Sequence, residues 1–265
     1  MERLFLQYLD RNDVFTRMTL FRYNKSLLLV LVILFLFAPF CEANRLSAQE
    51  RKIQNRPYLD DRVWHYGFLL GINIQDFAIA NRGLPYINEG IAEYWYADVP
   101  TYTPGFSVGI LGEIKANEWL SVRVIPTMHF GDKKVMFREQ RTGKFTEQYL
   151  KSTLLSVPVD LKISALRFNN YRPYIVAGAA PTFDLTVKKG KELLVKSADL
   201  MLEIGMGIDL YYPFFKMIPE LKFCFGLKNL LEKNRSDLQD PSLLKYTNSI
   251  NEVRSRMITL TLYFE

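Results

Sequence analysis

Cysteine and histidine are scarce in this sequence, which has two of each in 265 residues. Neither His65 nor His129 has a cysteine or a cluster of carboxylates beside it, so we expect no metal site. A hydrolase triad that combines His129 with Ser121 or Asp132 is an alternative interpretation, but the sequence has no nucleophile motif to support it. We therefore predict a protein without catalytic residues, without a cofactor and without a small-molecule substrate.

A cluster of basic residues is also missing. The 34 Lys and Arg and 28 Asp and Glu give a formal net charge of +6, but the basic residues are scattered along the chain. Nucleic-acid binding needs a basic patch or stripe, so we expect no nucleic-acid partner. An apolar content of 49% and an aromatic content of 14% permit a folded domain and exclude a chain that is disordered throughout.

Long apolar runs are confined to the N-terminal region. The segment from Ser26 to Phe40 is shorter than the about 20 apolar residues of a spanning helix and is typical of the apolar part of a signal peptide. We predict a signal peptide with an extended n-region over residues 1–48, cleaved after Ala43 or Ala48. An uncleaved membrane anchor is the alternative. The basic residues that precede the apolar segment are Arg17, Arg22 and Lys25.

The residues around the predicted cleavage sites exclude two further features. Cys41 is not preceded by the residues of a lipobox, so we expect no lipid anchor. Cleavage leaves Cys224 as the one remaining cysteine, and a single cysteine forms no internal disulfide. Residues 49–64 are polar, charged and without periodicity, and we interpret them as a periplasmic tether.

The clearest pattern is a predicted hairpin between Ala198 and Leu231. Apolar residues alternate with small or polar ones at a period of two in both halves, which indicates β-strands. One face is apolar throughout, and the other carries Gly205, Gly207 and a few charged residues. In a transmembrane barrel the apolar face meets lipid and glycine fits the narrow interior, whereas glycine is costly on the exposed face of a soluble sheet. This contrast favours a barrel over a soluble sandwich. The apolar faces comprise Leu200, Leu202, Ile204, Met206, Ile208 and Leu210, and Leu221, Phe223, Phe225 and Leu227.

The same period recurs along the chain and predicts eight strands. Pro126 interrupts the third and predicts a bulge, because proline cannot donate to the ladder. We predict an all-β fold, an eight-stranded antiparallel up-and-down transmembrane β-barrel over residues 65–265 that follows the signal peptide. A soluble periplasmic barrel or sandwich is the alternative. The patterns cover residues 67–75, 106–115, 119–130, 154–163, 171–187, 200–211, 221–228 and 257–264.

The connections between these strands fall into short and long classes. Those after the second, fourth and sixth strands are short, those after the first (Asp76 to Pro104) and seventh (Glu232 to Glu252) are long, and the others are intermediate. Outer-membrane barrels have short periplasmic turns and longer outer loops, so we predict localisation in the outer membrane with both barrel ends of the chain on the periplasmic side. Aromatic residues at the predicted periplasmic rim are Tyr66, Trp119, Tyr171, Tyr174, Tyr211, Tyr212, Phe214 and Tyr263.

Charged residues of both signs fall on the predicted inner face. An eight-stranded barrel is too narrow for an open pore, so we expect these residues to form a paired network that fills the lumen. A proton or ion path is the alternative. The predicted network contains Glu113, Arg123, Asp160, Lys162, Asp184, Glu203, Asp209 and Lys222, with Lys115 and Lys228 on the same face.

The long segment after the first strand is rich in aromatic residues. Its composition is typical of protein interfaces, so we predict a loop that contacts a partner. A lid folded over the barrel mouth is the alternative and is equally consistent with the composition. The loop residues are Tyr86, Tyr94, Trp95, Tyr96 and Tyr102, beside Glu89, Glu93 and Asp98.

Several strand segments in this order and spacing resemble the PorT family. The resemblance covers roughly residues 57–265 and implies an outer-membrane β-barrel required by the type IX secretion system, which exports proteins such as secreted proteases or gliding adhesins. It implies outer-membrane lipid and other secretion-system or envelope proteins as partners, and it carries over no catalytic residue. A structural or adhesive barrel and a lipid-modifying barrel enzyme remain as alternatives. The segments run over residues 66–73, 155–162, 169–174, 202–210, 219–223 and 254–257.

Overall fold

The computed structural model describes residues 54–83, 85–88, 91–186, 193–234 and 243–265. The predicted signal peptide, its cleavage sites and the first part of the predicted tether lie outside these residues. Among the described residues, no helix is long and apolar enough to cross a membrane.

Strands make up most of the described chain, with the short helix α2 (Leu244–Ser249) before the last of them. The strands are β1 (Trp64–Asn81), β2 (Tyr86–Asn88), β3 (Ile91–Glu93), β4 (Trp95–Asp98), β5 (Pro104–Lys115), β6 (Leu120–Val124), β7 (Thr127–Glu139), β8 (Phe145–Ser156), β9 (Val159–Ser164), β10 (Tyr171–Asp184), β11 (Ala198–Tyr211), β12 (Lys216–Gly226) and β13 (Ile250–Phe264).

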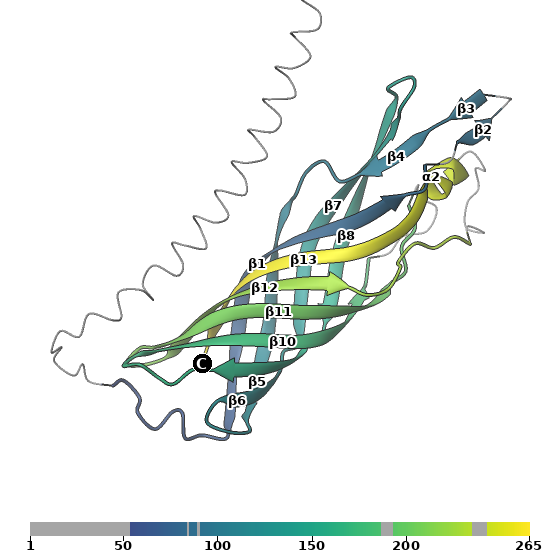
Figure 1. The fold of residues 1–265 in the computed structure, drawn as a ribbon. Helices are drawn as coiled ribbons and strands as arrows, with labels where there is room; N and C mark the ends of the chain where they lie inside the picture. The colour runs from purple at the N-terminus through teal and green to yellow at the C-terminus, as the bar shows by residue number, and fades with distance from the viewer. Residues whose placement is uncertain (1–53, 84, 89–90, 187–192, 235–242) are drawn as a thin grey trace, which may run out of the picture. The chain divides into compact units, whose positions relative to one another are not determined.

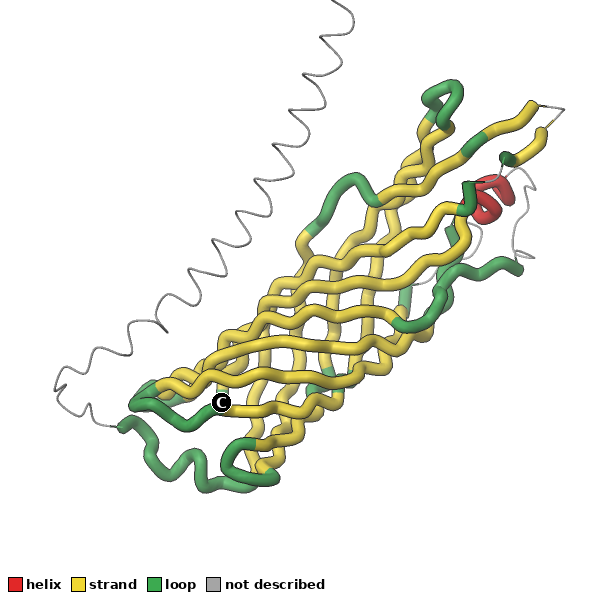
Figure 2. Tube along the Cα trace, in the orientation of Figure 1, coloured by secondary structure: helices red, strands yellow, loops and turns green. Residues whose placement is uncertain are grey.

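Antiparallel pairing closes the long strands into a ring (Figures 1 and 2). Around the ring the order is β1, β5, a divided strand formed by β6 and β7, a second divided strand formed by β8 and β9, and then β10, β11, β12 and β13. Strand β13 pairs with β1 and closes the ring, with Leu262 opposite Leu70. Each strand pairs with its sequence neighbour, as the short turns require. The predicted eight-stranded antiparallel up-and-down barrel is confirmed.

Prolines divide two of the eight barrel strands. Pro126 separates β6 from β7, and Pro158 separates β9 from β8, because proline has no N–H to donate to the ladder. The ladder is interrupted at Pro126 as predicted, but the predicted bulge is absent, because the register to β5 is the same on both sides, with Gly112 opposite Val124 and Gly109 opposite Thr127. The carbonyl oxygens of Pro126, Pro158 and Pro181 still accept hydrogen bonds at 3.0, 3.1 and 3.1 Å, from the N–H groups of Ile110, Ile125 and Val157. The three prolines therefore form a row across adjacent strands.

The two faces of the wall have opposite chemistry. Ile204 and Leu161 on the outer face are 57% and 51% exposed, whereas Asp160, Lys162 and Glu220 on the inner face are buried. A soluble protein has the reverse arrangement, and an outer surface of this kind is stable in contact with lipid. The predicted direction of the apolar side chains is confirmed, which contradicts a soluble sandwich.

Two predicted connections contain structure that the sequence did not reveal. The segment from Asp76 to Pro104 is not a loop throughout, since β1 continues to Asn81, β2 and β3 pair with each other, and β4 pairs with β7. The polar segment before β13 contains α2. Strands β7 and β8 also continue past the predicted ends, so the connection between them shrinks to a tight turn with Gly143 at a φ of 72°.

The predicted ring of aromatic residues at the short-turn end is only partly correct. Tyr66, Trp119 and Phe214 are exposed at that rim. Tyr174, Tyr211 and Tyr263 are instead buried inside, because each lies an even number of residues from an inward-facing neighbour on its own strand. Pro219, predicted in the connection before the seventh strand, lies within β12.

Both ends of the barrel are closed. At the long-loop end, an apolar cluster includes Phe77, Trp95, Phe137, Leu231 and Tyr246. At the short-turn end, residues 54–62 cross the mouth as a turn-rich segment that we call the strap. Part of the predicted tether is therefore docked on the barrel through Leu59, which is buried.

Candidate functional site

Glycines and alternating polar residues make room for charged side chains in the lumen. An added Cβ at Gly178 would collide with the carboxylate of Asp160, and one at Gly207 would collide with the ring of Tyr174. These glycines are therefore needed for close approach of the side chains to the wall rather than for a special backbone conformation.

Arg123 is the centre of the charged lumen and is fully buried. Its Nε donates to Glu113 at 2.8 Å, and its Nη1 donates to Glu220 at 2.6 Å. The guanidinium also lies over the rings of Tyr174 and Tyr263, 4.7 and 5.6 Å from their centroids. The two tyrosine hydroxyls donate to Glu220 at 2.5 and 2.7 Å. Glu220 therefore accepts hydrogen bonds from one charged donor and two neutral donors.

A branch of ion pairs runs from Arg123 toward the strap. Lys162 Nζ lies 3.5 Å from Glu113 and 2.8 Å from Asp209. Lys216 Nζ in turn lies 3.4 Å from Asp209 and 3.0 Å from the side chain of Glu265. Each cation thus bridges two carboxylates.

Glu265 connects this branch to the start of β1. Its side chain pairs with the ring Nδ1 of His65, and His65 Nε2 lies 3.1 Å from the carbonyl oxygen of Arg62 in the strap. Burial raises the pKa of Glu265, but the hydrogen bond with His65 and the charge of Lys216 outweigh it, so the net pKa is below the usual 4.5.

A second branch extends to the middle of the barrel. Lys222 Nζ lies 2.5 Å from Asp160, 3.3 Å from Glu203 and 3.4 Å from Glu220. Because Glu220 also binds Arg123, the two branches form one continuous network, which we call the lumen network. It runs from Glu265 at the short-turn end to Glu203 at mid-height.

The structure brings together most of the residues predicted for this network. Asp184 lies elsewhere, nearer the long-loop end, where it accepts hydrogen bonds from Ser152 and Thr186. Of the other predicted inward cations, Lys228 is exposed and Lys115 donates to the carbonyl oxygen of Asp60. The predicted members that the network unites are Glu113, Arg123, Asp160, Lys162, Glu203, Asp209 and Lys222.

Sequence reasoning missed Glu220, Lys216 and Glu265. Glu220 lies two residues before Lys222, and this spacing alone would have placed it on the inner face. Glu220 was missed because the predicted seventh strand begins only at Leu221, so that Pro219 and Glu220 fall in the connection before it. Lys216 and Glu265 lie at strand ends, where the sequence does not determine whether a side chain turns inward.

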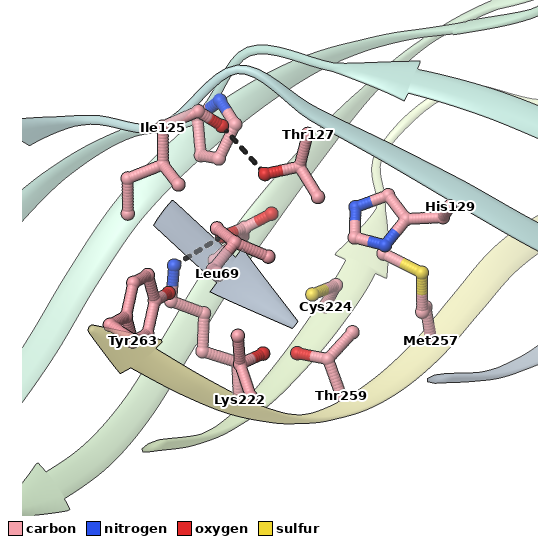
Figure 3. A pocket seen from close by; sticks show the side chains of 12 residues that line it. Leu69, Ile125, Thr127, His129, Lys222, Cys224, Met257, Thr259 and Tyr263 are labelled. Atoms are coloured by element: carbon pink, nitrogen blue, oxygen red, sulfur yellow. Dashed lines mark hydrogen bonds and ion pairs between the residues drawn. The ribbon is translucent and has the colours of Figure 1, made fainter. Parts of the chain in front are cut away.

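A cavity of about 20 Å³ lies above Lys222, between β7, β12 and β13 (Figure 3). That volume holds about one water molecule. His129 faces this cavity and shares a 2.8 Å hydrogen bond with Ser107. Asp132 is exposed on the outer face, and Ser121 is opposite Lys162 on another strand pair, so the alternative triad is not assembled. The described residues contain no cluster of three or more His, Cys, Asp or Glu that could hold a metal ion.

The predicted partner loop is divided between two environments. Tyr94, Tyr96 and Tyr102 are exposed, whereas Trp95 is 6% exposed and packs edge-on against Tyr246 at 5.0 Å. Trp95 therefore closes the barrel mouth, as in the alternative interpretation of this segment. The side chain of Tyr86 lies outside the described part of the structure.

A groove of about 960 Å³ opens at the long-loop end beside β4, the β7–β8 turn and α2. Charges of both signs line it, and Lys245 Nζ lies 4.7 Å from the ring centroid of Trp95. Its charged lining residues are Glu93, Glu139, Arg141, Lys144 and Lys245.

The chain is similar to several solved structures. Neisserial surface protein A has 10% identity to the chain, with 76% of this chain and 98% of that one covered and a TM-score of 0.40. Ail, the attachment invasion locus protein of Yersinia pestis, in complex with the heparin analogue sucrose octasulfate, has 12% identity over 75% and 96% of the two chains and a TM-score of 0.31. A search of curated proteins found no match.

The sequence profile of the outer membrane protein beta-barrel domain matches residues 47–232, which is more than half of the chain. The profile agrees with the lipid-facing outer wall and the closed ring of strands. The chain is located in the outer membrane and belongs to the outer membrane protein beta-barrel domain family.

Proposed function

We propose that this protein is a non-enzymatic component of protein secretion in the outer membrane, within a type IX secretion system. The structural observation that supports an accessory role, rather than transport through the barrel, is the filled lumen. Ion pairs occupy the interior from Glu265 to Glu203, and the cavity above them holds about one water molecule. A barrel of this kind acts through its ends rather than by passing cargo through its centre.

The long-loop end supplies the surface for contacts with other envelope proteins. Tyr94 and Tyr96 project from the β4 segment, and the groove beside it has charged walls. Exposed tyrosine beside charged residues is typical of protein interfaces. The secretion role itself rests on the resemblance of the strand segments to the PorT family.

The test is deletion of the gene followed by measurement of exported proteins in the medium. We expect secreted proteases to accumulate inside the cell and the wild-type gene to restore export. Complementation with Tyr94→Ala/Tyr96→Ala tests the surface, and Phe106→Ala on the lipid-facing wall is the control. Unchanged export after deletion would remove the secretion role.

A structural or adhesive barrel is the second candidate, because the same exposed tyrosines suit adhesion. It predicts normal export and reduced surface attachment in the deletion strain. A lipid-modifying enzyme is less well supported, since the cavity at His129 is too small for a lipid headgroup. His129→Ala and Ser121→Ala variants with full function would exclude that site.

A further inference from the structure

The strap is bound to the short-turn end by a converging set of polar groups. The Asp60 carboxylate accepts a hydrogen bond from the Tyr211 hydroxyl at 2.6 Å and pairs with Arg167 at 3.1 Å and Arg172 at 3.8 Å. Lys115 Nζ donates to the backbone carbonyl of the same residue at 2.5 Å. Asp60 is therefore held from several directions.

A second anchor lies five residues before Asp60. The backbone N–H of Asn55 donates to Asn170 Oδ1 at 2.8 Å, and its side-chain amide donates to the carbonyl oxygen of Tyr211 at 3.0 Å. The carbonyl oxygen of Asn55 accepts a hydrogen bond from Arg167. Backbone groups of the strap are thus recognised together with its side chains.

Arg167 joins the two anchors. Its guanidinium lies 3.6 Å from the centroid of the Tyr211 ring, and it binds Asn55 and Asp60 with different nitrogens. A stacked arginine presents its planar donors in a fixed direction, and it is suited to carboxylate recognition. The geometry is therefore set by the barrel and not by the strap.

The groups that hold the strap come from separate parts of the barrel. Lys115 ends β5, Arg167 and Asn170 lie in the β9–β10 turn, Arg172 is on β10 and Tyr211 ends β11. Such a convergence on one short peptide has the form of a receptor and its ligand. Leu59 adds an apolar anchor between Asn55 and Asp60, since it is buried against the barrel.

We propose that the short-turn end carries a peptide-binding socket, formed by Lys115, Arg167, Asn170, Arg172 and Tyr211, that the strap occupies in cis. Its ligand class is a short polypeptide segment with an apolar residue directly before an aspartate, as Leu59 precedes Asp60 in the strap. A segment of this kind in another protein would bind the same groups once the strap is displaced. The proposal goes beyond the secretion role and does not depend on it.

Occupation in cis has a measurable consequence. A ligand on a short linker competes at an effective concentration on the order of millimolar. A free peptide should therefore bind weakly to the wild type and more tightly to a chain whose strap is weakened. Binding should also fall with added salt, because charges at the rim are screened.

The experiment measures fluorescence anisotropy of a labelled peptide with the sequence of residues 54–62, added to the full chain in detergent. The strap is weakened by Asn55→Ala/Asp60→Ala, and folding is checked by the heat-dependent shift of the barrel in gel electrophoresis. We expect the peptide to bind this variant at least about tenfold more tightly than the wild type. A peptide with asparagine in place of Asp60 should lose most of its affinity.

Socket variants on the weakened background complete the test. Arg167→Ala should reduce peptide affinity more than about tenfold, and Arg254→Ala, which removes an arginine from the outer wall, should leave it unchanged. If Arg167→Ala does not fold, Tyr211→Phe removes the hydroxyl that binds Asp60 and should weaken binding several-fold. Three results would overturn the proposal. These are the absence of saturable peptide binding to the Asn55→Ala/Asp60→Ala variant, equal binding of the peptide to this variant and the wild type, and a loss of affinity from Arg254→Ala as large as that from Arg167→Ala.

Discussion

Replacement of Arg123 by methionine tests whether the lumen network holds the barrel together. Arg123 is fully buried, and its loss leaves two buried carboxylates without their closest cation. Removing one partner of a buried ion pair typically costs about 3–5 kcal/mol. Glu113 keeps Lys162 at 3.5 Å, and Glu220 keeps Lys222 at 3.4 Å, so we expect a loss of about 3 kcal/mol, the lower end of that range.

The assay is urea-induced unfolding in lipid vesicles, followed by tryptophan fluorescence. Arg254→Met is the matched control, because the Arg254 side chain is 51% exposed and pairs with Glu252 on the surface. We expect that variant to change the free energy of unfolding by less than about 1 kcal/mol.

A compensating variant separates the charge from the volume of the side chain. Adding Glu113→Gln to Arg123→Met removes one of the carboxylates left without its guanidinium and should recover part of the lost stability. The reasoning is refuted if Arg123→Met and Arg254→Met have equal effects, or if the loss for Arg123→Met is below about 1 kcal/mol.

Three further predictions concern the lumen and its ends. Gly207→Ala should destabilise the barrel by about 1–3 kcal/mol in the same urea assay, because the new Cβ meets the Tyr174 ring. Gly112→Ala should not, because its Cβ makes only an ordinary contact, 3.6 Å from the carbonyl oxygen of Val124. Because the pKa of Glu265 is lowered, its carboxylate stabilises the fold above the usual pKa of 4.5, and this contribution is lost as the pH falls through its folded-state pKa. Glu265→Gln should therefore reduce stability at pH about 7, and its effect should shrink as the pH is lowered below 4.5; an effect that does not change with pH would contradict the ion pairs. The purified barrel should give no steady ion conductance in planar bilayers, since ion pairs fill the described part of the lumen and the two cavities lined by its residues hold only about 20 and 10 Å³. Stable open channels would contradict a filled lumen.

Strand number and side-chain direction were predictable because they depend on local alternation. Leu202, Ile204 and Leu260 point outward and Asp160 points inward, as a period of two requires. Partners were not predictable in the same way. Lys222 on β12 binds Asp160 on β9, three strands away around the ring, and this contact depends on the register and shear of the closed ring, which no single strand specifies.

Features outside the barrel wall were the least predictable. The pairing of β4 with β7 is formed by four residues, and so short a segment carries too weak a periodicity to be detected among aromatic residues. The docking of Asn55 and Asp60 depends on Asn170 and Tyr211, which are more than a hundred residues away in sequence. Composition alone does not reveal such contacts, and it predicted an undocked tether.

The pairing of β4 with β7 gives the long segment after β1 a protective role. The upper part of β7 extends beyond the last residue that it pairs with on β5 and would otherwise present unpaired backbone groups toward solvent, a template for aggregation. By folding back as β4, the segment shields this exposed edge. Removing β4 would expose this edge again and should favour self-association of the barrel at its outer rim.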